Sequence, residues 1–176
     1  MSAPVSRRAF VATIAVATVL PARAALAQPG GDREVLEAAL RLEQTAVATY
    51  GAAARSGLLD RQATELSKLF GEQDQAHAEA LTAALGALGA SAPPPPREDS
   101  IRRLGRLRTS AGFARIAIEL ELEAVAAYHE AQLELQDREL LSLCARIMAS
   151  EGQHLALLRS LAGKSPVPHA FERGVA

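Results

Sequence analysis

The sequence has few cysteines and few aromatic residues, which stabilise many small folds through disulfides and ring packing. Cys144 is the only cysteine among 176 residues, so no intramolecular disulfide can form. Tryptophan is absent and aromatic residues make up 3% of the chain, so aliphatic side chains must fill the core, which favours helices. The formal net charge is -1, without the basic excess expected of a nucleic-acid-binding protein. Composition therefore indicates one helical domain and no nucleic-acid partner.

Acidic residues are missing from residues 1–27, which predict an export signal. Arg7 and Arg8 precede Phe10 and an apolar stretch that is too short for a stable membrane span. Ala-Leu-Ala at 25–27 offers the small-x-small pattern that a signal peptidase accepts. The paired arginines resemble the twin-arginine motif, and an ordinary secretory signal is the alternative. We expect the twin-arginine export machinery as a partner and a periplasmic or extracellular location.

The mature chain is expected to begin with a short tether at 28–31. Without the signal, 16 basic residues stand against 20 acidic ones, so the mature protein is mildly acidic. No cysteine directly follows the apolar stretch, so a lipoprotein anchor is not expected.

Residues 32–163 predict an all-α fold, an antiparallel four-helix bundle built from two helical hairpins. The expected helices run from Asp32 to about 55, from Asp60 to just before Gly89, from 110 to 135 and from 137 to 162. The proline-rich crossover at 90–109 is long enough to return the chain to the opposite end of the bundle. Residues 164–176 are expected to form an irregular tail on the bundle surface. In the second helix, helical spacing places one set of residues inward: Leu66, Leu69, Phe70, Gln73, His77, Leu81, Leu85 and Leu88.

One stretch of the chain occurs twice. The residues from Leu42 to Tyr50 reappear seventy-eight residues later, from Leu120 to Tyr128, with Leu, Glu, Ala, Val, Ala and Tyr in the same register. Each copy is followed, about 30 residues after its Glu, by a carboxylate and a histidine three residues apart. This repeat predicts two copies of one hairpin, each with two carboxylates and one imidazole.

The six repeated side chains are expected to meet inside the bundle and to bind metal: Glu43, Asp74, His77, Glu121, Glu151 and His154. In each hairpin, the two carboxylates lie at nearly equal distances from the turn, so antiparallel pairing brings them to the same height. A separation of three residues places each carboxylate and its histidine on one helical face. Glu119, Glu123, Glu72, Glu79 and His129 fall beside the inward stripe and are expected to be solvated.

Four carboxylates facing one another would repel and take up protons, and two divalent cations would remove that repulsion. Oxygen and imidazole donors without a thiolate suit iron or manganese better than structural zinc, which stays an alternative. The hydroxyls of Tyr50 and Tyr128 are expected to hydrogen-bond to metal-binding carboxylates. The alternative is that both tyrosines only pack in the core.

This arrangement resembles the ferritin-like superfamily, and in particular the exported bacterial ferritin-like domain proteins. The resemblance extends from about Val35 to Phe171 and includes the proline-rich crossover and the Pro-Val-Pro-His-Ala-Phe tail. Glu43 and Glu121 match the family's single glutamates, and Glu151 with His154 matches its Glu-x-x-His motif. Asp74 departs, because it is one methylene shorter than the usual Glu. Glu72 is a poorer donor, since it lies about 140° away from His77 around the helix.

The resemblance implies oxidation of Fe(II) by dioxygen or peroxide, in iron homeostasis or oxidative defence, at a site with two divalent ions. A ferroxidase or peroxidase-type di-iron oxidoreductase is therefore the first hypothesis. The alternative is a non-catalytic bundle, a binding or structural envelope protein with a structural or vestigial metal site. An iron-storage cage is a third and weaker hypothesis. The oligomeric state stays open, with a homodimer among the candidates.

Overall fold

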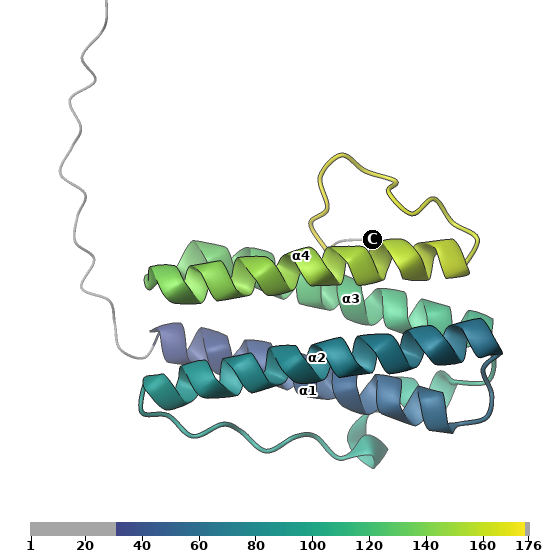
Figure 1. The fold of residues 1–176 in the computed structure, drawn as a ribbon, viewed down its shortest axis with the longest axis horizontal. Helices are drawn as coiled ribbons and strands as arrows, with labels where there is room; N and C mark the ends of the chain where they lie inside the picture. The colour runs from purple at the N-terminus through teal and green to yellow at the C-terminus, as the bar shows by residue number, and fades with distance from the viewer. Residues whose placement is uncertain (1–30, 175–176) are drawn as a thin grey trace, which may run out of the picture.

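The structure, a computed structural model, describes residues 31–174 and confirms the all-α four-helix bundle. The four helices are α1 (Gly31–Arg55), α2 (Arg61–Ala87), α3 (Ser110–Glu134) and α4 (Arg138–Leu161) (Figure 1). Two short 3-10 helices, η1 (Glu98–Ser100) and η2 (Arg102–Arg106), lie in the crossover. The predicted export signal at 1–27, with Arg7 and Arg8, lies outside the described residues. None of the described helices is both long and apolar enough to cross a membrane.

Local sequence signals mark the ends of the helices. Asp60, Thr109 and Asp137 are N-caps whose side chains accept hydrogen bonds from the first free backbone N–H groups of α2, α3 and α4. Gly57 and Gly89 follow α1 and α2 with φ values of 68° and 71°, which favour glycine over residues with a Cβ. These signals fix the lengths of the helices and therefore the height of each side chain in the bundle.

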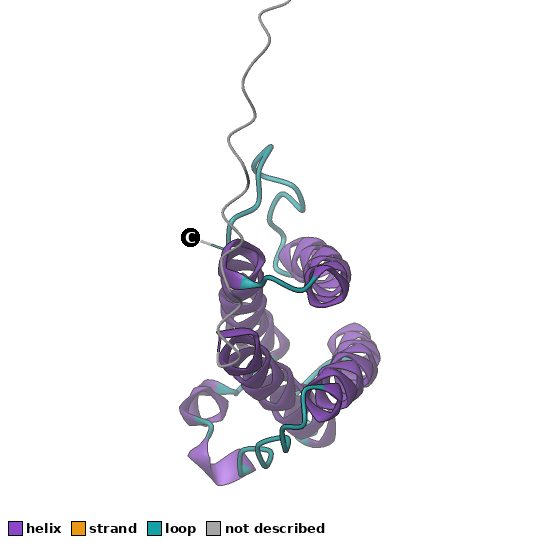
Figure 2. Cartoon of the chain, turned by 90° about the vertical axis from the view of Figure 1, so that its left-hand side faces the viewer, coloured by secondary structure: helices purple, strands orange, loops and turns teal. Residues whose placement is uncertain are grey.

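The crossover runs along the whole length of the bundle from the end of α2 to the start of α3 (Figure 1). Viewed end-on, it lies on the outside of the helices (Figure 2). Polar contacts hold it there: Gln44 Nε2 donates to the Pro93 carbonyl over 3.0 Å, and ion pairs join Arg55 to Glu98, Arg103 to Glu123 and Arg106 to Glu119. Glu119 and Glu123 are thus exposed and paired with crossover arginines. The crossover sets α3 antiparallel to α1.

The buried apolar residues form two clusters, one toward each end of the bundle. One cluster contains Leu36, Leu81, Tyr128 and Cys144, and the other contains Tyr50, Phe70, Phe113 and Leu155. Seven polar residues are buried within 31–174, and five of them lie at the height between the two clusters: Glu43, Asp74, Glu121, Glu151 and His154. The apolar clusters therefore keep water away from a polar layer at mid-height.

The predicted inward face of α2 is partly wrong. Leu69 and Leu88 are 43% and 47% exposed. Gln73 is also an exposed residue overall, although its Oε1 reaches inward to His154. The buried stripe passes instead through small residues: Ala63 and Ser67 are buried, and a Cβ added to Gly71 would lie 3.3 Å from Tyr50 Cβ. Close packing of α1 on α2 uses these small residues, so helical spacing of leucines alone misplaces the face.

The tail is irregular and lies on the bundle surface. Arg159 on α4 pairs with Glu172 over 2.6 Å. Gly174 has a φ of 71°, and a Cβ at this position would lie 2.3 Å from the backbone oxygen of Leu122 on α3. Only glycine fits this close approach.

We expect Leu81→Ala to lower the free energy of unfolding by about 2–5 kcal/mol, because this fully buried side chain leaves a cavity in the core. Leu69→Ala on the same helix is the matched control, expected to cost about 0.5 kcal/mol or less because the side chain is exposed. Urea unfolding of both variants checks the orientation of α2. Equal losses would contradict it.

Candidate metal centre

Four helices contribute six metal-donor side chains to the mid-height layer: Glu43 on α1, Asp74 and His77 on α2, Glu121 on α3, and Glu151 and His154 on α4. Five of these residues are 1–2% exposed, and the His77 side chain is 15% exposed. The structure thus brings together all six residues that the sequence singled out. That they bind metal stays a prediction.

Carboxylates from three helices surround His77. Its Nδ1 lies 3.0 Å from Glu151 Oε1, 3.3 Å from Glu43 Oε2 and 3.8 Å from Asp74 Oδ1. These four residues offer donor atoms that all lie within 4.8 Å of one another. They form one candidate metal position, which we call the His77 position.

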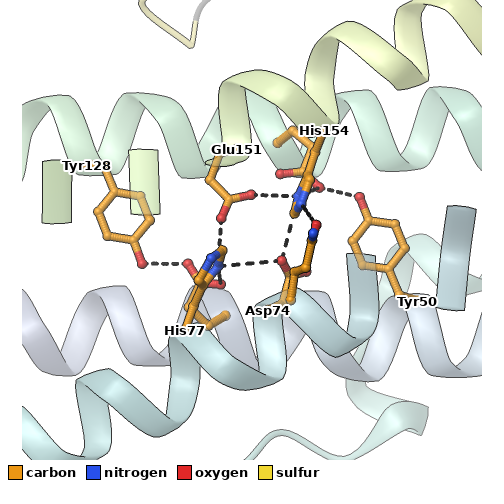
Figure 3. Close-up of polar contacts among 9 residues, drawn as sticks. Tyr50, Asp74, His77, Tyr128, Glu151 and His154 are labelled. Atoms are coloured by element: carbon orange, nitrogen blue, oxygen red, sulfur yellow. Dashed lines mark hydrogen bonds and ion pairs between the residues drawn. The ribbon is translucent and has the colours of Figure 1, made fainter. Parts of the chain in front are cut away.

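The second candidate position, the His154 position, is built in the same way. His154 Nδ1 lies 3.1 Å from Glu151 Oε2, 3.5 Å from Glu121 Oε1 and 3.7 Å from Asp74 Oδ1. Glu121, Glu151 and His154 form the second group of donors within 4.8 Å of one another. Glu151 therefore presents one oxygen to each histidine, and Asp74 Oδ1 lies at nearly equal distances from both (Figure 3).

The two tyrosines flank this centre on opposite sides (Figure 3). The Tyr50 hydroxyl on α1 donates to Glu121 on α3, and the Tyr128 hydroxyl on α3 donates to Glu43 on α1. Burial raises the pKa of both tyrosines well above the usual value, so both hydroxyls keep their protons and act as donors. These reciprocal bonds link the two hairpins and fix one oxygen of each single glutamate.

His154 has contacts beyond the six donors. Its ring stacks on Phe70, with ring centroids 4.1 Å apart, and its Nε2 lies 2.6 Å from Gln73 Oε1. The sequence pattern indicated no role for Phe70 or Gln73 at the centre. The one available signal was position, since Gln73 directly precedes Asp74 and Phe70 lies one helical turn before it.

Without metal, the four buried carboxyl groups have pKa values that differ from the usual ones and from one another. Burial, followed by the charges of Glu121, Glu151 and Glu43, raises the pKa of Asp74 to about 9, and burial likewise raises the pKa of Glu121 to about 8. Burial also raises the pKa of Glu43. Burial also acts to raise the pKa of Glu151, but its contacts with His154 and His77 have the larger effect and lower this pKa. Glu151 is therefore the carboxylate best placed to remain charged between the two histidines.

The donor atoms fit divalent metal ions. Both Asp74 oxygens, Glu151 Oε1 and His154 Nδ1 are buried without a hydrogen-bond partner, although His77 Nδ1 lies 3.0 Å from that Glu151 oxygen. A buried polar atom left without a partner costs about 1–3 kcal/mol, so these four atoms need another partner. Carboxylate oxygens and imidazole nitrogens are the donors that iron and manganese accept in proteins.

Other acidic and histidine residues lie outside the centre. Glu72 is exposed, whereas Asp74 is buried, so Asp74 is the donor that α2 offers at this height. Glu79 accepts a hydrogen bond from Gln75 on the surface, and the His129 side chain is 48% exposed.

A four-helix bundle whose mid-height layer holds two carboxylate and histidine groups belongs to the ferritin-like class of folds. Residues 31–164 match the ferritin-like domain family, and the chain therefore belongs to this family. It is also similar to the crystal structure of a conserved hypothetical protein from Mycobacterium tuberculosis, with a TM-score of 0.66 and 18% sequence identity over 81% of this chain and 97% of that chain. This likeness shows the fold alone. No curated protein matches the chain.

Metal-free protein is expected to lose stability as the pH rises from about 6.5 to about 10. Burial lowers the pKa of His77 and His154, but contacts with carboxylates outweigh it and raise both pKa values to about 10. Between these pH values the folded protein keeps histidine protons that the unfolded chain releases. The stabilisation by the two protonated histidines is therefore complete below pH 6.5 and is lost as the pH rises toward 10. The raised pKa of Asp74 acts in the same direction.

Urea unfolding in the presence of a chelator, at several pH values across this range, measures the effect. Saturating Mn(II) is the control, because the metal replaces the protons and its binding strengthens as they dissociate. Constant or rising stability of the metal-free protein with pH would contradict this distribution of charge.

Proposed function

We propose that the protein binds two iron ions at this centre and oxidises Fe(II) with dioxygen or peroxide. The observation that carries the proposal is the pair of buried donor groups that share Glu151. Two independent surface sites would not share a carboxylate. A shared carboxylate favours two adjacent ions, and two adjacent ferrous ions supply two electrons to a small oxidant.

Each residue has a defined part in this proposal. Glu43, Asp74 and His77 would hold one ion, Glu121 and His154 would hold the other, and Glu151 would contact both. Asp74 also faces both positions, so its shorter side chain is compatible with a shared role. Tyr128 holds Glu43 Oε1 and leaves Oε2, the oxygen nearer His77, for metal. Tyr50 bonds to Glu121 Oε1, the oxygen that faces His154, and so fixes the direction of that carboxylate.

Burial restricts what can react at the centre. Five of the six donor residues are at most 2% exposed, and apolar clusters close both ends of the layer. Dioxygen and peroxide are small enough to reach such a site, whereas a large organic substrate is not. The donor set of oxygen and imidazole nitrogen favours iron, with manganese as the nearest competitor and zinc as a further one.

The proposed location is outside the cytoplasm, as the periplasmic or extracellular form of a protein exported by the twin-arginine machinery. Arg7, Arg8 and the apolar stretch after them support this proposal. Replacing both arginines by lysine keeps the charge of the segment, and we expect it to abolish export in cell fractionation. Unchanged export would point to the general secretory route instead.

The test of function is metal binding and Fe(II) oxidation by the protein without residues 1–27. We expect about two Fe(II) per chain in an anaerobic titration, and oxidation on adding dioxygen or peroxide at a rate well above that of buffer. The variant His77→Ala/His154→Ala loses both imidazoles and is expected to oxidise Fe(II) no faster than buffer does. His129→Ala/His169→Ala is the matched control, because His129 and His169 are exposed and away from the centre.

The outcomes separate the candidate functions. Binding of two ions without accelerated oxidation would favour a structural metal site in a non-catalytic bundle. An unchanged melting temperature on adding Fe(II), Mn(II) or Zn(II) would favour a vestigial site, because a ligand that binds only the native state must stabilise it.

A further inference from the structure

The two histidines of the centre have different surroundings. The His154 side chain is 2% exposed and its ring is covered by Phe70 on α2. The His77 side chain is 15% exposed. The repeat in the sequence predicts equivalent positions, so this difference needs a cause outside the six donors.

Gln73 fixes the ring of His154 from the neighbouring helix. Its Oε1 lies 2.6 Å from His154 Nε2, and a carbonyl oxygen can only accept, so Nε2 carries the proton of this hydrogen bond. The other ring nitrogen, Nδ1, is buried without a hydrogen-bond partner and lies 3.1 Å from Glu151 Oε2. The contact thus presents Nδ1 to the centre as the donor atom.

The counterpart of Gln73 in the second hairpin is Ser150. Gln73 directly precedes Asp74 on α2, and Ser150 directly precedes Glu151 on α4. A serine side chain is too short to reach as Gln73 does, and within residues 31–174 no hydrogen bond joins Ser150 to His77. Phe70 likewise has no aromatic counterpart, because Ile147 stands at the matching position of α4. The His154 ring therefore has two contacts, with Phe70 and Gln73, that its repeat partner His77 lacks in the described part of the chain.

We propose that Gln73 is a positioning residue that locks His154, and that the two metal positions are therefore inequivalent. An ion at the His154 position would exchange slowly with solvent. The His77 position, whose imidazole is 15% exposed, would be the one through which ions enter and exchange. This inference rests on the proposed function for the presence of two ions, but not for the difference between the histidines.

Isothermal titration with Mn(II) tests the effect on metal. We expect Gln73→Ala to weaken the binding of one of the two ions about 10–100-fold and to leave the affinity for the other unchanged. A loss of this size is usual when the hydrogen-bond partner of a metal-binding histidine is removed. Gln73→Glu keeps an acceptor for Nε2 and is expected to restore binding. Gln75→Ala is the matched control, because Gln75 lies on the same helix and its side chain donates a hydrogen bond to the exposed Glu79 rather than to a residue of the centre.

Proton exchange in the metal-free protein tests the same inference without metal. In imidazole NMR spectra, the Nε2 proton of His154 is expected to exchange with water slowly in the wild type and at least about tenfold faster in Gln73→Ala, because an opened hydrogen bond exposes the proton. Ser150→Gln is expected to slow the exchange of the His77 ring.

The outcomes distinguish this inference from the proposed function. If the wild type binds no Mn(II) or Fe(II), the proposed function fails, whereas the exchange experiment still decides the role of Gln73. Two ions that bind equally well to wild type and Gln73→Ala would overturn the inference while leaving the function intact. So would equal exchange rates for His77 and His154 in the wild type.

Discussion

The constraint on which this structure depends is the burial of four carboxylates in one layer of a small helical core. Each buried charge costs several kcal/mol unless it is neutralised by a proton, a hydrogen bond or a cation. Two histidines and two tyrosine hydroxyls offset part of this free energy, but both Asp74 oxygens are left without a hydrogen-bond partner. The layer thus has carboxylate oxygens that could bind cations in place of protons.

The rest of the bundle supports that layer. Apolar clusters on both sides exclude water, which strengthens every electrostatic interaction between them. The reciprocal bonds of Tyr50 and Tyr128 join the two hairpins at the height of the centre, and the crossover fixes the direction of α3. The symmetry is not complete, because Gln73 and Phe70 contact His154, whereas Ser150 and Ile147 stand at the matching positions beside Glu151.

The sequence predicted the bundle and the meeting of the six side chains because both depend on spacing. The repeat from Leu42 to Tyr50 and from Leu120 to Tyr128 set the register, and turns at equal distances brought the carboxylates to one height. Spacing also predicted that both tyrosine hydroxyls would reach carboxylates, but not which carboxylates. Leu69 and Leu88 were misjudged because the orientation of α2 depends on close packing of Gly71 against Tyr50, which a hydrophobic pattern does not reveal. Gln73 and His154 are 81 residues apart in sequence, and the position of Gln73 next to Asp74 does not by itself predict their contact.

The most direct measurement of the central claim is anomalous X-ray scattering from crystals of the mature protein grown with Mn(II). The account predicts two anomalous peaks inside the bundle, on either side of the Glu151 carboxylate, with one peak next to His77 and the other next to His154. Peaks confined to the surface, or a centre with no peak at all, would contradict it.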